Sequence, residues 1–197
     1  MNIAQISLVV ALLAGGLRSG AETSGNCGQT LAVPLHSRAA LMVESRSGGI
    51  EVVGTDEHIA RVTCTQDQES SEPVSLSFSG SAEQEKLTIS GGHEGNLKIR
   101  LEVPRHTNLA VHVPAGQVTV KGVMGDKDIT VNAGQIVIDC GDARQYASVE
   151  ASVHIGEVQA SAYGVEKGGF FRSFSRQNAG GEYRLRAHVL TGQIELQ

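Results

Sequence analysis

The residues that could bind a metal are spread widely along this chain, which has seven histidines and three cysteines. His112 and His188 each stand four residues before a glycine of a recurring pattern, so they occupy the same position relative to that pattern. Imidazole nitrogens of this kind are typical zinc ligands. Strand alternation points both side chains outward, and 76 residues separate them. We therefore predict that they do not meet and that the chain has no metal site.

Two pairs of acidic residues could in principle bind calcium or act as paired carboxylates. Asp126 and Asp128 flank Lys127, and Asp139 and Asp142 bracket a Cys-Gly dipeptide. Short acidic side chains favour turns, because they form hydrogen bonds with their own backbone. The pairs therefore predict turns rather than a calcium site or a catalytic site.

Sequence signatures of common enzymes are absent. The chain has no G-x-S-x-G, no H-E-x-x-H, no P-loop and no C-x-x-C. Its His-Glu pair, His93-Glu94, lies in a glycine-rich turn without a second ligand at helical spacing. We expect no catalytic residues, no cofactor and no enzyme activity. A carbohydrate-active enzyme is the least favoured alternative, since it would need converging carboxylates that the sequence does not supply.

The elements that position outward side chains come from a repeated pattern. In each copy a glycine and a variable residue precede two apolar residues separated by one position. The pattern occurs five times, at Gly48, Gly116, Gly134, Gly156 and Gly192. In the C-terminal half the glycines lie 18, 22 and 36 residues apart. The last interval is twice the first, as if one repeat between them had lost its signature.

A period near 20 residues is typical of a solenoid. Alternating apolar residues within each copy indicate a half-buried strand, and the glycine marks a sharp turn before it. The sequence therefore predicts an all-β fold, a β-solenoid or single-stranded β-helix-like repeat domain. Its outward polar residues, among them Glu51, Thr119, Gln159 and Glu195, would form a ladder. The alternative is a β-sandwich whose strands begin with glycine.

The N-terminus has the features of a secretory signal. Residues 6–17 are a nearly continuous apolar run of 12 residues, too short to span a bilayer comfortably. Small residues at 19–21 predict cleavage before Glu22, although no Lys or Arg precedes the apolar run. An uncleaved anchor, or a lipoprotein attached through Cys27, are the alternatives. We predict a signal peptide at 1–21, a polar lead-in at 22–38, and the β-solenoid domain at 39–197.

The charge and the cysteines suit an exported, soluble domain. The net charge is −5; without residues 1–21, 15 basic residues face 21 acidic ones, a charge of −6. This balance argues against nucleic-acid binding. Two of Cys27, Cys64 and Cys140 could form a disulfide in an oxidising compartment, and the sequence leaves all three pairings open. Cys64 could equally be a buried small apolar residue.

Two C-terminal segments are candidates for contacts with a partner. The segment from 168 to 176 holds three of the four phenylalanines, and aromatic side chains beside arginines suit a partner or an anionic surface. The candidate contact residues are Phe170, Phe171, Arg172, Phe174 and Arg176. Alternatively, the phenylalanines cap the solenoid core. If residues 193–197 form the last strand, their open edge predicts weak self-association.

Three groups of residues resemble a bacterial family of exported putative adhesins, a domain of unknown function. They are the segment 44–50 (ESRSGGI), the segment 101–105 (LEVPR), and the C-terminal blocks FFRSF and YRLRAH at 170–174 and 183–188. The resemblance covers about residues 39–197. It implies a β-helix-like or β-solenoid fold without known catalytic residues. The family's usual Ser-Gly-Asp-Ile is changed here to glycine followed by Gln or Glu in the four later copies, which weakens any expectation of cation binding.

These observations predict an exported, non-catalytic binding or structural module at the bacterial cell envelope. Its location would be periplasmic, cell-surface or secreted, and its partner an envelope protein or glycan. The alternative is an envelope sensor or scaffold that assembles with other proteins. Fold class alone does not decide between these functions.

Overall fold

The computed structural model describes residues 22–66, 73–92 and 97–197. These residues form an all-β fold in which the strands make up one open thirteen-stranded sheet. The predicted signal peptide and the His93-Glu94 pair lie outside the described residues. No helix in the described part of the chain is long and apolar enough to cross a membrane.

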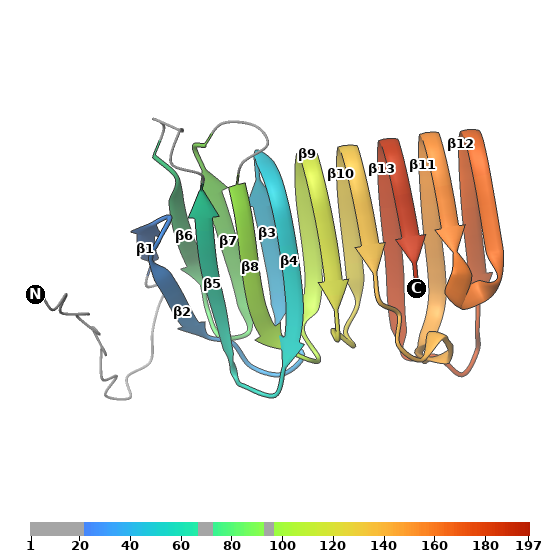
Figure 1. Ribbon diagram of the computed structural model, residues 1–197. Helices are drawn as coiled ribbons and strands as arrows, with labels where there is room; N and C mark the ends of the chain where they lie inside the picture. The colour runs from blue at the N-terminus through green and yellow to red at the C-terminus, as the bar shows by residue number, and fades with distance from the viewer. Residues whose placement is uncertain (1–21, 67–72, 93–96) are drawn as a thin grey trace, which may run out of the picture.

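Five long strands form the C-terminal part of the sheet. Each runs up one side of the molecule, turns over at one edge and returns down the other side (Figure 1). They are β9 (Asn108–Lys121), β10 (Lys127–Ile138), β11 (Tyr146–Ala160), β12 (Val165–Gln177) and β13 (Tyr183–Leu196).

The turn changes which side chains face the interior. In β9, Leu109, Val111 and Val113 are buried before Gly116, and Val118 and Val120 are buried after it. The inward positions are odd-numbered before the glycine and even-numbered after it. The shift in phase lets both halves of one strand bury apolar side chains against a common core.

The repeat glycines stack in register at this turn. Gly134 has a φ of +143°, a conformation that L side chains rarely adopt. A Cβ on Gly134 would overlap the carbonyl oxygen of Gly116. The same relation links Gly192 to Gly134 and Gly156 to Gly192. Glycine is therefore required here by both the backbone conformation and the close approach of the next strand.

The long strands do not stack in chain order. β13 lies between β10 and β11 and is parallel to both. The condition for an open edge at residues 193–197 is therefore not met, because Gln193–Leu196 pair with β10 on one side and with β11 on the other. The edge of the sheet is instead β12, which is antiparallel to β11 and places Gly169 opposite Gly156. In the chain this strand lies within the 36-residue interval between Gly156 and Gly192. It runs in the opposite direction to the other copies, which explains why it lacks their signature.

The N-terminal strands extend the same two layers. The order in one layer is β1-β6-β7-β3-β9, and in the other β2-β5-β8-β4-β9. The strands are β1 (Thr23–Asn26), β2 (Thr30–Pro34), β3 (Ala40–Ser45), β4 (Ser47–Thr55), β5 (Ile59–Gln66), β6 (Ser75–Gly80), β7 (Gln84–Ser90) and β8 (Leu97–Pro104).

The expectation that strands begin at Ala39 is wrong. Strands β1 and β2 belong to the sheet, and Val33 and Leu35 are buried in the core. Residues 22–38 are thus part of the fold rather than a polar lead-in. The apolar residues of this segment are confined to the short run 31–35, which is too short to show a clear alternation.

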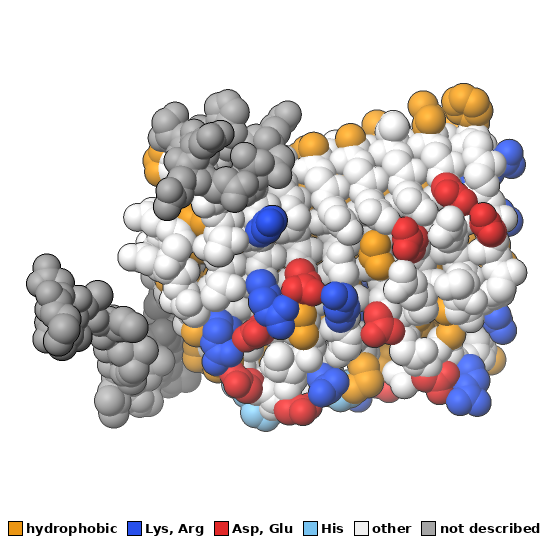
Figure 2. Space-filling model, in the orientation of Figure 1, with side chains coloured by type: hydrophobic (Ala, Val, Ile, Leu, Met, Phe, Trp, Pro, Cys, Tyr) orange, Lys and Arg blue, Asp and Glu red, His pale blue; other side chains and the backbone are white. Residues whose placement is uncertain are grey.

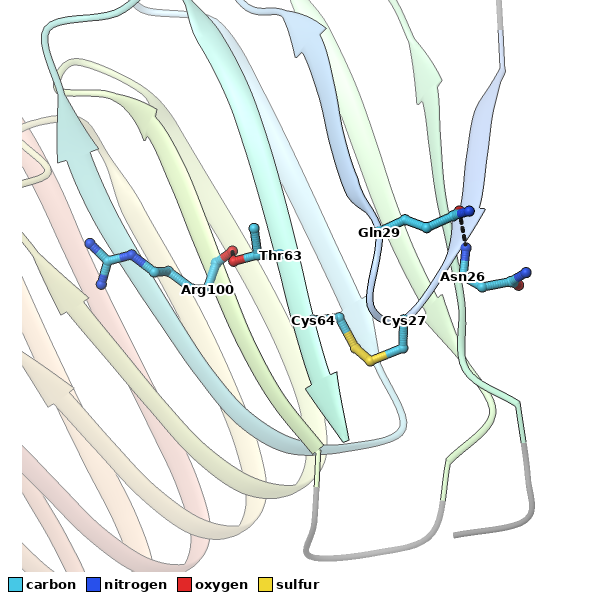
Figure 3. The surroundings of a disulfide bond; sticks show 6 residues. All are labelled: Asn26, Cys27, Gln29, Thr63, Cys64 and Arg100. Carbon is cyan, nitrogen blue, oxygen red and sulfur yellow. Dashed lines mark hydrogen bonds between the residues drawn. A yellow bond between two sulfur atoms is a disulfide. The ribbon is translucent and has the colours of Figure 1, made fainter. Parts of the chain in front are cut away.

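A disulfide joins the turn after β1 to strand β5. Cys27 follows β1 and bonds Cys64 of β5, across 37 residues of sequence (Figure 3). Asn26 N donates a hydrogen bond to Gln29 Oε1 at 3.0 Å, which tightens the turn between β1 and β2. Cys140 is a free, buried cysteine. Of the three pairings left open by the sequence, the structure selects Cys27 with Cys64.

Candidate binding surfaces

A groove of about 910 Å³ crosses one outer face of the sheet. Its central row follows the register of neighbouring strands: Lys86 of β7, Met42 of β3, Ala110 of β9, Asp128 of β10, Arg186 of β13 and Glu150 of β11. Neighbouring strands lie about 4.8 Å apart. The row therefore spans a width that several sugar units or an extended peptide would cover.

Differences in side-chain length create the groove. Ala40 and Ala110 supply a low floor on β3 and β9, beside the half-exposed Met42. Long side chains stand on both sides, Lys86 on one and Arg186 on the other. The depression therefore lies where small residues stand between large ones.

Ion pairs hold the walls of the groove. Lys86 Nζ lies 2.9 Å from Glu44 Oε2. Arg186 lies between two carboxylates, 3.6 Å from Asp128 and 3.4 Å from Glu150. These pairs are exposed, so each contributes little to stability. Their effect is to orient charges of both signs along the groove.

One buried carboxyl group borders the groove without a hydrogen-bond partner. Glu85 is 5% exposed, and its Oε1 has no partner among the described residues. Burial raises the pKa of this carboxyl above its usual range. An unpaired buried polar atom is costly. Glu85 shares the inward phase of Leu87 and Ile89 on β7, so its carboxyl group is not one of the outward groups of the groove.

The opposite face carries the predicted ladder. Register aligns Glu51, Thr119, Val137, Glu195 and Gln159 in one row across β4, β9, β10, β13 and β11. The sequence predicted four of these five outward positions. Val137 is the apolar member that it left out.

Charged residues concentrate at the β4–β8 end of this face (Figure 2). Glu51 accepts hydrogen bonds from Lys121 Nζ at 2.8 Å and from Arg100 Nη1 at 2.6 Å. Arg61 Nη1 donates to Glu102 Oε2 at 2.8 Å. The hydrogen bond from Lys121, with the charges of Lys121 and Arg100, lowers the pKa of Glu51. The charges of the network pair with one another, and a smaller groove of about 460 Å³ lies over Glu51, Arg100 and Lys121.

The predicted contact segment is divided by the structure. Phe170 and Phe171 are 68% and 76% exposed, whereas Phe174 is buried. Phe174 packs against Tyr163, with ring centroids 5.2 Å apart. Phe174 is therefore a core residue and is wrongly assigned to the contact surface. The cap interpretation suits Phe174, and the contact interpretation still suits the other two phenylalanines.

The arginines of this segment also differ in their contacts. Arg172 Nε donates to Gly168 O at 2.6 Å, and the Arg176 guanidinium lies over the ring of Tyr163 at 5.3 Å. Both side chains remain exposed on β12. The segment therefore keeps its positive charge at the edge of the sheet.

The histidines lie nearer to one another than their sequence separation suggests. His112 pairs in register with Thr130, and Thr130 with His188, so only β10 separates them. His188 Nδ1 lies 2.9 Å from Ser152 Oγ. Insertion of β13 next to β10 explains the short separation. No group of three potential metal ligands occurs among the residues that the structure describes.

The acidic pairs have structural contacts. Asp126 Oδ1 accepts a hydrogen bond from the backbone N–H of Arg184 at 2.8 Å. Asp139 Oδ1 accepts from Gly141 N, and Asp142 Oδ1 from Arg144 N. The bonds of Asp139 and Asp142 are local and fit the predicted turn. Asp126 instead contacts a distant strand, and Asp128 lies within β10, so the predicted turn does not include Asp128.

A buried lysine was missed at the sequence level. Lys127 is 2% exposed, and its Nζ donates to Tyr146 Oη at 2.6 Å and to Gly125 O at 3.2 Å. Burial lowers its pKa to about 8 and raises the pKa of the buried Cys140 thiol to about 11. The available signal was its inward phase with Ile129, which the flanking aspartates obscured.

Comparison with known proteins supports the fold. No family model matches the chain, and no curated protein matches it. The structure is similar to the crystal structure of a "putative cell adhesion protein" from Clostridium sporogenes, with a TM-score of 0.51. The similarity covers 85% of this chain and 98% of that chain, at 10% sequence identity. At this identity the likeness shows a shared fold, and membership of the adhesin family stays a prediction.

Proposed function

We propose that this protein is an exported, non-catalytic binding module of the bacterial cell envelope, and that its ligand occupies the groove between Lys86 and Arg186. The observation that carries the proposal is the groove itself, about 910 Å³ in volume, which lies in the range of ligand sites. The distant likeness to a protein described as a cell adhesion protein agrees with this function.

The chemistry of the groove suits a polar polymer. Its small apolar floor accommodates the C–H faces of sugars or the side chains of an extended peptide. Arg184 and Arg186 on one wall present planar donors for carboxylates or hydroxyl groups, and Asp128 and Glu150 present acceptors. We propose an envelope glycan or an envelope protein segment as the ligand. A defined protein partner would favour a scaffold or sensor over glycan adhesion.

The stacked strands supply a rigid platform for such a site. We propose that the glycine-bearing strands are copies of one structural repeat in a β-solenoid-like stack, with two of the copies exchanged in spatial order. Support comes from the common register of Gly48, Gly116, Gly134, Gly192 and Gly156. Binding groups on paired strands lose little freedom when a ligand binds.

Export is the second part of the proposal. The apolar segment at 6–17 and the Cys27–Cys64 disulfide both suit an oxidising extracytoplasmic compartment. Cell fractionation with intact-mass measurement tests it. We expect a soluble exported protein whose mass begins near Glu22. A full-length chain in the cytoplasm would contradict export.

Filling the groove tests the binding site. Ala110→Trp places a large side chain on its floor, and Val137→Trp places the same side chain at an outward position on the opposite face. Both variants and the wild type are measured against isolated envelope glycans and envelope proteins. We expect Ala110→Trp to weaken binding at least about tenfold, because a filled site excludes the ligand, while Val137→Trp binds normally. Equal binding by all three proteins would exclude the groove.

A further inference from the structure

The bends of the long strands align in an exposed row along one edge of the molecule. Ala115 pairs in register with Ala133, Ala133 with Thr191, Thr191 with Ile155, and Ile155 with Phe170. We define the ridge as these five residues with Leu190 and Phe171, which are sequence neighbours of two of them. With strands about 4.8 Å apart, the row from β9 to β12 extends roughly 19 Å.

The ridge becomes larger and more apolar toward β12. Ile155 and Leu190 are 49% and 46% exposed, and Phe170 and Phe171 are 68% and 76% exposed. Figure 2 shows apolar side chains along this edge, with the largest at the β12 end. Large exposed apolar side chains that gather in one place mark an interaction surface. They project from a convex edge, so a flat apolar environment would accommodate them better than a pocket.

Phe171 is held in an unusual backbone conformation. Its φ is +51°, which is uncommon for a bulky residue. Its ring lies edge-on to His154, with centroids 5.2 Å apart. A strained aromatic residue that projects into solvent is a candidate for function.

The strand that carries the phenylalanines is basic. Lys167, Arg172 and Arg176 lie on β12 with a single acidic residue, Glu166. Lys167 Nζ donates to Ser173 O at 2.9 Å, and Arg172 Nε donates to Gly168 O at 2.6 Å. These bonds occupy backbone carbonyls of the edge strand. Charged side chains on an edge strand oppose pairing with another strand.

We propose that the ridge binds an anionic lipid bilayer surface, with Phe170 and Phe171 inserted among the headgroups. Aromatic side chains next to cations favour this interface, because apolar burial and attraction to anionic lipids add. A second copy of the chain is disfavoured, since two β12 strands would bring like charges together. The lipid surface is a site separate from the groove, so the two proposals are independent.

Vesicle co-sedimentation tests the proposal with the wild type and the double variant Phe170→Ser, Phe171→Asn. Asparagine tolerates the left-handed backbone at 171, so the variant is expected to fold. The vesicles contain either phosphatidylglycerol with phosphatidylcholine or phosphatidylcholine alone. We expect the wild type to prefer the anionic vesicles, and the double variant to lose at least about tenfold in partitioning. All proteins are prepared identically, so any contribution of residues 1–21 is equal.

Three further variants separate the ridge from other surfaces. Arg172→Gln with Lys167→Gln changes the two basic residues nearest the bend of β12 and should reduce binding to anionic vesicles and its dependence on salt. Met42→Ser removes an exposed apolar side chain from the groove face and should bind as the wild type does. Ala110→Trp should also bind vesicles normally, which distinguishes failure of this proposal from failure of the groove. Equal partitioning of the wild type and the phenylalanine double variant would overturn the proposal, as would capture of an acidic protein without vesicle binding.

Discussion

Two regions of the sheet use the same repeat with different chain order. In the first, β3 and β4 pair with β9, and β9 pairs with β10, so the order in space still runs toward the C-terminus, although β5 to β8 come between β4 and β9 in the chain. In the second, β13 follows β10 in space, and β11 and β12 come after it. Glycines meet glycines in register in both regions. The repeat therefore specifies how two neighbours fit, while the connections determine which strands become neighbours.

The reversal at β12 is what changes the order. After β11, the short turn at 161–164 sends β12 back antiparallel. The chain then crosses below and enters parallel between β10 and β11. This insertion places Arg184 and Arg186 in the wall of the groove and Glu195 in the ladder. Both outer surfaces thus depend on the spatial order of the second region.

The largest expected effect is loss of a repeat glycine. Gly192 has a φ of +141°, and a Cβ added there would overlap the carbonyl oxygen of Gly134. We therefore expect Gly192→Ala to lower the free energy of unfolding by about 3 kcal/mol or more. Gly116→Ala, in the first region, should cost as much. Gly141→Ala is the control, since Gly141 has a φ of +56° but open space around it; it should cost about 1 kcal/mol. Chemical denaturation measures the free energy of unfolding of all three variants. If Gly192→Ala were as stable as the wild type while Gly116→Ala lost stability, glycine would be required in the first region but not in the second.

An intermediate effect is expected at the lysine that joins the two regions. Lys127 at the start of β10 donates a hydrogen bond to Tyr146 Oη at the start of β11. The first residues of β13 pair with both strands at this point. The folded-state pKa is about 8, below the usual value of 10.5, because burial disfavours the charged amine. Above pH 8 the unfolded state binds more protons than the folded state, so stability rises with pH. We expect a gain of about 1 kcal/mol between pH 8 and 9, measured by denaturation at each pH.

The variant Lys127→Met should abolish this rise. The raised pKa of Cys140, about 11, works in the opposite direction, and it does so already between pH 8 and 9, because the unfolded thiol with its usual value of 9.0 loses protons there. Both proteins keep Cys140, so the difference between the wild type and Lys127→Met is the informative quantity. A wild type whose stability relative to Lys127→Met stays flat from pH 8 to 9 would show that Lys127 is not buried as described.

The smallest effect is expected on the ladder face of the first region. Lys121→Ala removes the ion pair with Glu51, whose two side chains are 57% and 34% exposed. Solvent screens such pairs, so the loss should stay below about 1 kcal/mol and shrink at high salt. The lowered pKa of Glu51 means that its contribution is present at neutral pH and lost in acid. A larger loss, insensitive to salt, would point to packing rather than charge.

The local structure was largely predictable from the residues. Alternation around each glycine identified the all-β class and the inward rows, and four ladder residues were placed correctly because strand parity is a local property. The strand at Thr30–Pro34 (TLAVP) was not predicted, since its apolar run is short and lies within a mostly polar segment.

Long-range features were not predictable in the same way. The order of β11, β12 and β13 depends on a chain reversal whose strand lacks the glycine signature. Parity alone could not show that Phe174 faces the core while Phe170 and Phe171 are exposed, because β12 changes phase at its bend. The groove depends on which strands are neighbours, so no sequence pattern indicated it.

Disulfide cross-linking tests the position of β13 most directly. In a Cys140→Ala background, Asp128→Cys is combined with either Arg186→Cys or Glu150→Cys, and intact mass is measured after mild oxidation. Asp128 and Arg186 are directly opposed on neighbouring strands, about 4.8 Å apart and within disulfide reach. Asp128 and Glu150 are two strands apart, about 9.6 Å, which is too far. We predict efficient cross-linking of the 128–186 pair only. Cross-linking of the 128–150 pair instead would mean that β10 and β11 are neighbours, and would contradict the inserted strand.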